Sequence, residues 1–355
     1  TQTYAGETCH QNPWLHMWIM AASFKVFGVS EWSARFPTCL QSILMVLLTF
    51  LLVQWLTDRP WVGMMSASFL LLSDFFFKYA RKAHMDHLMA LMFLLAMMMY
   101  IAGRKRNQIW FLPMGLAIGL AILTKSVLGL MPAAVIVAHI ILGREWRVLG
   151  KPLFWLSALV ALAVGCSWYI FEYVNFRGEF VQEHFEWQVL SRSVFDDVSG
   201  QGFAIGAFLL GRLRHLYAFL KDAHVWLLMA VLGAVFSVLP AKDPGRSSGS
   251  APGERLLLIL WLVIPVILVS FADAFKGWYL MPVFIPMAIL AAFFFARIIR
   301  SNEKLRVVNF AALSILLLYL GILTVTPLFT FDLQHEIRHP GIRKLATKVR
   351  ALGPE

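Results

Sequence analysis

The sequence predicts an all-α membrane protein that crosses the bilayer about ten times. Of its 355 residues, 59% are apolar and 14% are charged, with a mean hydropathy of +0.71. Ordinary soluble domains are about 45–50% apolar and about 25% charged. The apolar residues also gather in long runs, and a transmembrane helix needs about 20 such residues. Finally, lysine and arginine concentrate in alternate loops between these runs, as they do in polytopic membrane proteins.

Ten apolar runs are the expected transmembrane helices. They lie at residues 37–57, 61–79, 86–103, 110–124, 127–142, 153–171, 223–240, 256–272, 278–296 and 307–327. The fourth and fifth runs are short for a span, so they are either two helices or one helix broken around the sequence LTKS. Residues 14–28 precede the first span and are interrupted by Lys25. We therefore expect this stretch to lie along the membrane surface.

The chain divides into three parts on this interpretation. Residues 1–36 form an outer loop with a juxtamembrane helix, and residues 37–327 form the transmembrane domain. That domain includes an outer amphipathic segment at 172–222, where Val181, Phe185 and Val189 recur at helical spacing. Residues 328–355 begin a C-terminal outer segment.

Loop charge predicts which side of the membrane each loop occupies. The loops rich in lysine and arginine are 58–60, 103–109, 143–152, 241–255 and 297–306. The positive-inside rule places them in the cytoplasm. The formal net charge of +11 is explained by these loops, and we expect no nucleic-acid partner. Cys9, Cys39 and Cys166 are far apart and predict neither a disulfide framework nor a zinc site.

Several cations interrupt the opposite, outer face. They are Lys78, Arg81 and Lys82 in the stretch KYARKAHMDH, Lys125 between two apolar runs, and Lys276 in a tight turn. Ionisable residues at membrane depth are costly and are functional candidates. Ammonium and guanidinium groups on one face could bind a phosphate or pyrophosphate. The alternative is that these side chains only reach for water from helix ends, and Lys125 fits that alternative least well because apolar runs flank it closely.

Asp86 begins an apolar run and has two interpretations. An acid in the first turn of a helix is stabilised by the helix dipole. A carboxylate facing the same cavity as the cations could instead act in catalysis or orient a sugar hydroxyl. The spacing of His84, Asp86 and His87 also leaves a divalent metal ion open as a cofactor, although this spacing alone is weak evidence and we assign no metal ligands.

A series of ordered motifs resembles one family of membrane enzymes. The stretch YAGETCHQNPWLHMWIMAASFKVFGVSEWSARFP resembles the first outer loop of GT-C glycosyltransferases that use a polyprenyl-phosphate sugar. The branch is that of the lipid A aminoarabinose transferases and the protein O-mannosyltransferase-like bacterial enzymes. The stretches YARKAHMDHLMA, GLAIGLAILTKSVLGLMP, SWYIFEYVNFRGEFVQEHFEWQVLSR and KGWYLMPVFIP follow in the family's order. The stretch GLAIGLAILTKSVLGLMP is similar to the family's G-L-A-x-L-T-K-G-x-x-G segment, with Thr124 and Lys125 in place.

The resemblance implies a fold, a reaction and a set of site residues. It implies an integral membrane glycosyltransferase of the GT-C type, in the bacterial inner membrane with its active site facing the periplasm. The donor would be a polyprenyl-phosphate-linked sugar, and the acceptor a lipid-linked glycan or a protein, among membrane lipids. Asp86 would be catalytic. The donor phosphate would be bound by Lys78, Arg81, Lys82, Lys125 and Lys276, and substrate by Asn12, His16, Trp18, Arg192 and Tyr279.

The chain departs from the family pattern in its first outer loop. Asn12 stands where the family has a lysine that contacts the donor phosphate. The family's first transmembrane helix and its acidic pair would lie before Thr1, so we expect that helix, the acidic loop and the main catalytic carboxylate to be missing from this chain. An inactive relative or a fragment is therefore one alternative. Another is a polytopic transporter or lipid flippase for an anionic substrate, which should show inverted repeats.

Overall fold

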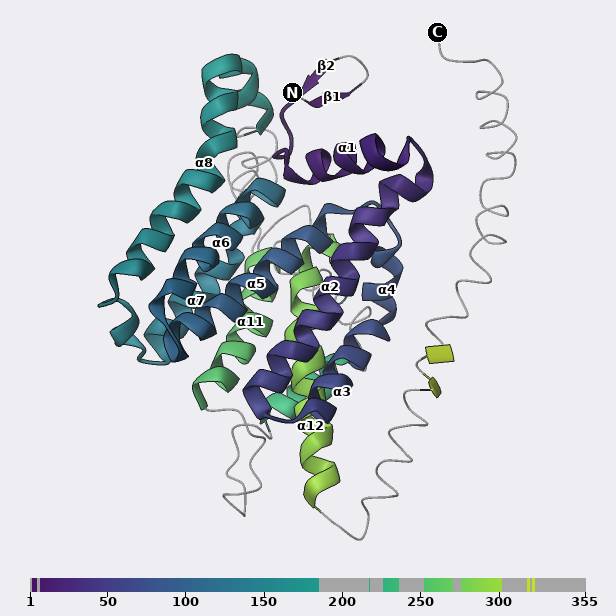
Figure 1. Ribbon diagram of the computed structural model, residues 1–355, viewed down its shortest axis with the longest axis vertical. Coiled ribbons are helices and arrows are strands. Elements are labelled where there is room, and N and C mark those ends of the chain that lie inside the picture. The colour runs from purple at the N-terminus through teal and green to yellow at the C-terminus, as the bar shows by residue number, and fades with distance from the viewer. Residues whose placement is uncertain are drawn as a thin grey trace, which may run out of the picture.

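The protein is a bundle of membrane-spanning helices (Figure 1). The computed structural model describes residues 2–4, 7–184, 217, 226–235, 252–270, 276–301, 318, 319, 321 and 322. Within these residues, six helical stretches are long and apolar enough to cross a membrane, or seven if one bent pair counts as a span. The predicted class of all-α integral membrane protein is confirmed. A short hairpin of β1 (Gln2–Tyr4) and β2 (Glu7–Cys9) adds a two-stranded antiparallel element that the sequence did not predict.

The first two helices meet at a corner on the outer side of the bundle. Helix α1 (Leu15–Phe27) lies across the end of the bundle, and α2 (Glu31–Thr57) runs through it (Figure 1). A capping box starts α2, because the Ser30 side chain accepts from the Ser33 backbone and the Ser33 side chain accepts from the Ser30 backbone. The helix therefore begins at Glu31, earlier than the predicted span start at residue 37, and Pro37 lies inside it.

The second predicted run is a broken span. Helix α3 (Pro60–Leu71) begins with a proline, which suits the first helical position because its missing N–H would be unpaired there. Helix α4 (Asp74–Ala80) follows after a short break, and the two axes differ by 68°. The turn that carries Arg81, Lys82 and His84 therefore leaves from a bent span.

Residues 108–142 cross the bundle twice. Helix α5 (Met85–Lys105) is followed by the 3₁₀ turn η1 (Gln108–Trp110), α6 (Phe111–Lys125), the 3₁₀ turn η2 (Ser126–Leu130) and α7 (Met131–Leu142).

Contacts with the two ends of α5 show in which directions α6 and α7 run. Lys125, at the end of α6, bonds to Asp86 in the first turn of α5. His139, near the end of α7, lies 3.0 Å from the Tyr100 hydroxyl, close to the last turn of α5. The chain must reverse between them, so the fourth and fifth predicted runs are two antiparallel helices.

A glycine makes this reversal compact. A side-chain carbon on Gly129 would lie 2.4 Å from the Ala121 carbonyl group, so η2 packs directly against the backbone of α6. Helix α6 also packs closely on α8 (Pro152–Phe180), with Gly115 and Gly119 at the contact. Small residues let helix backbones approach in this way.

Helix α8 extends beyond the predicted span. The sequence predicted a helix over 153–171, but α8 continues to Phe180 with a break in helical geometry at Arg177. Residues 172–176 therefore belong to the helix of the span, and a kink at Arg177 separates them from residues 178–184, the described beginning of the predicted outer segment. Phe185, Val189 and Arg192 lie outside the described residues.

The remaining described helices close the bundle. They are the short helix Trp226–Val235, α11 (Pro252–Ser270), the 3₁₀ turn η6 (Gly277–Val283) and α12 (Phe284–Ser301). The eighth and ninth predicted spans correspond to α11 and to η6 with α12. Most of the tenth, 307–327, lies outside the described residues, so the count of ten is not tested.

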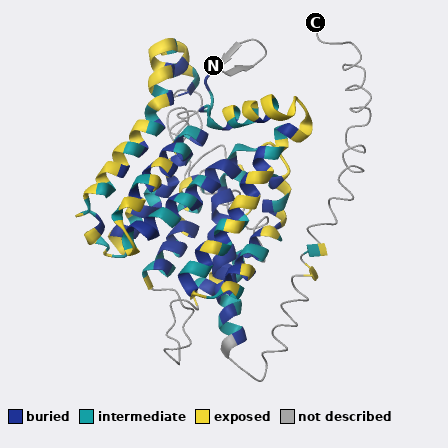
Figure 2. Ribbon diagram, viewed as in Figure 1, coloured by how far each residue is buried: buried dark blue, intermediate teal, exposed yellow. Residues whose placement is uncertain are grey.

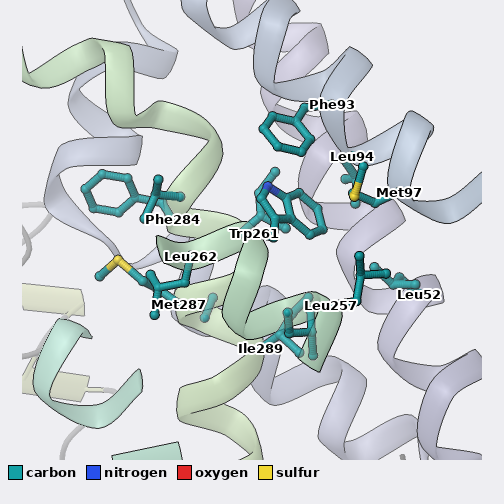
Figure 3. Packing of buried hydrophobic residues seen from close by; sticks show 14 of the residues in the cluster. Leu52, Phe93, Leu94, Met97, Leu257, Trp261, Leu262, Phe284, Met287 and Ile289 are labelled. Carbon is teal, nitrogen blue, oxygen red and sulfur yellow. The ribbon is translucent and has the colours of Figure 1, made fainter. Parts of the chain in front are cut away.

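The core lies where α2, α5, α11 and α12 meet. Figure 2 shows α5 largely buried and α8 with a strongly exposed outer face. Trp261 of α11 stacks on Phe93 of α5 at a centroid distance of 5.1 Å, and Met97, Leu257 and Ile289 are in the same buried cluster (Figure 3). This core holds the outer end of α5, and hence Asp86, in a fixed place.

A polar cluster joins the end of α5 that lies away from Asp86 to the beginning of α11. Arg104 of α5 pairs with Glu145 and lies 3.7 Å from Glu254 of α11, while Lys105 lies 3.2 Å from Glu254. The Lys151 ammonium donates to the Gly103 carbonyl at 2.9 Å. These residues belong to the loops predicted to be cytoplasmic, so the bundle separates the two predicted faces.

Candidate functional site

The site centres on a buried ion pair between Lys125 and Asp86. Lys125 is the last residue of α6, and Asp86 lies in the first turn of α5. Asp86 is fully buried and Lys125 is 9% exposed. The Lys125 ammonium donates to Oδ1 of Asp86. Two charges removed from water need each other, because an isolated buried charge costs several kcal/mol, roughly. The sequence predicted both residues for the site but did not predict that they pair.

His84 occupies the other oxygen of the same carboxylate. Its Nδ1 lies 2.7 Å from Oδ2 of Asp86. The ring is flanked by Tyr79 and Trp278, both with centroids 5.3 Å away and both edge-on. Oδ1 of Asp86 thus accepts from Lys125, while Oδ2 lies at contact distance from His84 without a hydrogen bond among the described residues, and the carboxylate lies between the ends of α4, α5 and α6. We considered His84 at the sequence level only as a metal ligand.

Tyr279 and Trp278 of η6, with Lys276 just before it, lie on another side of the site. The Lys125 ammonium lies 3.9 Å from the centre of the Tyr279 ring, which is a cation–π contact. Lys276 is exposed, lies 5.4 Å above the Trp278 ring and acts electrostatically on Lys125. Tyr279 and Lys276 from one predicted stretch and Lys125 from another therefore come together.

Helix α1 brings His16 to the same place. His16 is 3% exposed, and it interacts electrostatically with His84 and Asp86. Burial is the main reason that the pKa of His16 falls to about 4, and the neighbouring His84 lowers it further while Asp86 opposes the change. His16 is therefore neutral at pH 7. Its Nδ1 has no hydrogen-bond partner within the part of the chain that the structure describes.

Three predicted cations lie in the last turn of α4 and on the turn that follows it. Lys78, Arg81 and Lys82 are exposed, and Lys82 lies 4.7 Å from the centre of the Tyr79 ring. Partial burial and the neighbouring Lys78 ammonium lower the pKa of Lys82. This group of like charges flanks the buried pair, and Tyr79 connects it to His84.

The predicted substrate residues of the first outer loop have different environments. Asn12 is partly buried. Trp18 is 60% exposed on α1 and stacks on Trp14 at 5.0 Å. Exposed tryptophans at this level suit the membrane interface. Arg192 lies outside the described residues, so its predicted place in the site is not tested.

A polar network around Glu172 was missed by the sequence reasoning. Glu172 of α8 is 1% exposed, and Nδ1 of His10 lies 2.7 Å from its carboxylate. The indole N–H groups of Trp14 and Trp168 donate to the same carboxylate at 3.2 and 3.1 Å. An acidic residue inside the apolar sequence WYIFEYV was the available signal, since charges are expensive in such runs.

The arrangement offers cations and aromatic surfaces, and it offers little for a metal. Within the described ranges, no group of three or more His, Cys, Asp or Glu side chains is suited to hold a metal ion. The alternative of a divalent ion at His84, Asp86 and His87 therefore gains no support. A buried lysine with a second lysine nearby can stabilise negative charge on an oxyanion such as phosphate.

Comparisons with known proteins agree with this fold. Residues 11–171 match the dolichyl-phosphate-mannose-protein mannosyltransferase family. An uncharacterised protein of Aquifex aeolicus is 28% identical over 187 residues, covering 51% of this chain and 37% of that protein. The undecaprenyl phosphate-α-4-amino-4-deoxy-L-arabinose arabinosyl transferase of Edwardsiella ictaluri is 24% identical over 318 residues, covering 86% of this chain and 53% of that protein.

Solved structures show the same fold. The crystal structure of ArnT from Cupriavidus metallidurans bound to undecaprenyl phosphate matches with a TM-score of 0.65 at 19% identity, over 92% of this chain and 57% of that chain. The apo structure of the same protein matches with a TM-score of 0.63.

The fold is that of a polytopic membrane protein and is shared with the solved ArnT structures. The predicted resemblance to the aminoarabinose transferases and to the protein-mannosyltransferase-like enzymes is confirmed by these matches. The chain spans about half the length of the curated transferases that it matches.

Proposed function

We propose that this chain is part of a membrane glycosyltransferase that takes a sugar from a polyprenyl-phosphate donor, undecaprenyl phosphate in a bacterium. The acceptor is a hydroxyl of a lipid-linked glycan or a protein. The reaction takes place at the periplasmic face of the inner membrane. The observation that carries the proposal is the buried Lys125–Asp86 pair, with Tyr279 and Lys276 beside it, at the face opposite the basic loops.

Lys125 is the residue we assign to the leaving phosphate. Transfer breaks the bond between the anomeric carbon and the phosphate oxygen, so negative charge grows on that oxygen. An ammonium held in a site with little water stabilises this charge more strongly than it would in solution. Lys276 is close enough to act electrostatically on Lys125, and both cations would act on the same phosphate.

Asp86 acts in this proposal by holding Lys125. It is fully buried, its Oδ1 accepts from Lys125 and its Oδ2 lies 2.7 Å from the His84 ring, so it is poorly placed to accept a proton from the acceptor hydroxyl. A general base must be within hydrogen-bond reach of that proton. We therefore refine the predicted catalytic role of Asp86 to one of positioning and charge balance, and we assign the base to a different carboxylate.

The exposed cations Lys78, Arg81 and Lys82 would guide the anionic donor to the site. Lys78 lies in the last turn of α4 and the other two on the turn between α4 and α5, and the Tyr79 ring contacts both Lys82 and His84. Charges on an exposed turn raise the local concentration of an anionic substrate. Their individual removal should affect donor affinity more than the rate of transfer.

The test is sugar transfer by the full-length protein in liposomes, with a labelled undecaprenyl-phosphate sugar and acceptor lipid. Lys125→Ala should reduce transfer by about a hundredfold or more, as loss of one charge-stabilising group typically does. Lys25→Ala is the matched control, because Lys25 is an exposed lysine of α1 outside the site. Transfer that survives Lys125→Ala unchanged would contradict the assignment. Flux of an anionic solute without any glycosyl product would favour the transporter alternative.

A further inference from the structure

Ser126 has a backbone conformation that side chains disfavour. It directly follows Lys125 and has φ 52° and ψ −129°. Asp58 also has a positive φ, but its ψ of 29° places it in the ordinary left-handed region at a helix end. The values of Ser126 are those of the first central residue of a type II′ turn, where glycine is strongly preferred. Strain of this kind persists only where neighbouring groups hold it.

Two side chains of α8 and its extension hold the Ser126 hydroxyl. It bonds to the Tyr169 hydroxyl and lies 3.1 Å from Nε2 of His184. His184 is 1% exposed, and its Nδ1 lies 3.1 Å from the carbonyl oxygen of His10. The strained turn is thus tied to α8 and, through one imidazole ring, to the N-terminal segment.

The N-terminal segment is in turn fixed by buried charges. The His10 ring bonds to Glu172, and the backbone N–H of His10 donates to Glu183 at 2.9 Å. Trp14 donates to Glu172 as well. Residues 10–14 are therefore docked on α8. From the carbonyl oxygen of His10, two hydrogen bonds through the His184 ring lead to Ser126, the residue that follows Lys125.

We propose that Ser126 is a positioning residue for Lys125, and that docking of residues 10–14 on α8 sets the Lys125 geometry through His184 and Ser126. The turn at Ser126 aims the Lys125 side chain at Asp86 and Tyr279. Its hydroxyl bonds keep a residue with a side chain in a glycine-like conformation. This inference rests on the proposed donor-binding role of Lys125, and it adds a link between the first outer loop and that lysine.

Two substitutions at one position separate conformation from chemistry. Ser126→Ala removes the hydroxyl but keeps the strained Cβ, so the turn should relax and displace Lys125. Ser126→Gly removes the same hydroxyl but adopts the turn without strain. With undecaprenyl phosphate as the probe, Ser126→Ala should weaken binding about tenfold and Ser126→Gly less than about threefold. Equal losses in both variants would mean that the hydroxyl itself binds the ligand, and no loss in either would mean that it has no role; both outcomes overturn the proposal.

The link to the outer segment is tested by a double-mutant cycle. Glu172→Ala should weaken undecaprenyl phosphate binding in the natural sequence. In the Ser126→Gly background, where the turn no longer depends on the hydroxyl bonds, the same change should have much less effect. Equal effects in both backgrounds would refute the coupling. Melting temperatures in detergent identify variants that lose binding only because they unfold.

A readout without the ligand keeps this test separate from the proposed function. Labelling of Lys125 by an amine-reactive reagent, followed by mass spectrometry, should be slow in the natural protein because the ammonium is buried and paired. Ser126→Ala should increase labelling several-fold, and Ser126→Gly should not. Unchanged labelling in Ser126→Ala would overturn the positioning role. The expected labelling pattern together with absent sugar transfer would leave that role intact and refute only the proposed function.

Discussion

The Lys125 ammonium and the Asp86 carboxylate, 39 positions apart in the sequence, form a buried ion pair where α6 ends and α5 begins. The pair lies at the ends of these two helices, next to the turns that connect the apolar bundle. It also explains how a lysine flanked by apolar runs is tolerated. The second oxygen of the Asp86 carboxylate lies 2.7 Å from Nδ1 of His84.

Breaking this pair should destabilise the protein. Asp86→Asn leaves the Lys125 charge buried without its counter-charge, and removing one partner of a buried pair typically costs about 3–5 kcal/mol. The double variant Asp86→Asn with Lys125→Met should recover much of that stability, because no unpaired charge is left. Unfolding free energies in mixed micelles measure both. A double variant as unstable as Asp86→Asn alone would argue against the ion pair as the cause.

Measuring donor binding in the same variants distinguishes a loss of stability from a loss of function. The double variant should stay unable to bind undecaprenyl phosphate, because it lacks the ammonium. Binding restored together with stability would show that Lys125 does not contact the phosphate.

Gly129 should be sensitive to the smallest added side chain. Gly129→Ala places a carbon 2.4 Å from the backbone of Ala121, and neither backbone can move without opening the contact between η2 and α6. Overpacking of this kind costs about 1–3 kcal/mol. Gly178→Ala is the control, because no atom lies within 4 Å of the added carbon. Thermal melting in detergent should show a lower transition only for Gly129→Ala; equal transitions would contradict the close packing.

The buried cluster of Arg104, Lys105 and Glu254, which lies in loops predicted to be cytoplasmic, should contribute more to stability than an exposed ion pair. Glu254 is 2% exposed and pairs with Lys105 and Arg104, so Glu254→Ala should lower the free energy of unfolding by about 3 kcal/mol or more. Glu31 pairs with Arg35 at 3.2 Å, but both side chains are more than half exposed. Glu31→Ala should therefore cost less than about 1 kcal/mol. A similar cost for the two changes in denaturant titrations would refute the burial argument.

His16 should make stability depend on pH in the acidic range. Its pKa in the folded protein is about 4, against 6.5 for an unperturbed histidine. Between these values the unfolded chain binds a proton and the folded protein does not, so stability falls as the pH decreases from about 6.5 to about 4. The loss approaches about 3 kcal/mol, from 1.36 kcal/mol per pKa unit.

The comparison with His16→Gln isolates this contribution from other histidines. The variant should lose less stability than the natural protein over the same pH range, while their difference stays constant above pH 7. Parallel pH profiles for the two proteins would show that His16 is not the group responsible.

Much of the fold could be predicted because it depends on local properties of the sequence. The apolar runs identified the spans that are described, and the ordered motifs identified the family relationship. The predicted edges were less accurate where a local signal was overlooked. The capping box of Ser30 and Ser33 moved the start of α2 to Glu31. The choice between one broken helix and two helices at residues 110–142 needed the contacts of Lys125 and His139 with opposite ends of α5.

The sequence by itself determined that the protein is a membrane bundle, that its basic loops lie on one side, and that Lys125 is an unusual lysine. These follow from hydrophobicity, charge and motif order along the chain. Only the tertiary structure decided that Asp86 pairs with Lys125 and that His10 pairs with Glu172 across 162 positions. The reason is physical, because a buried charge is stabilised by whichever partner the packing of distant helices brings to it, and no local pattern records that partner.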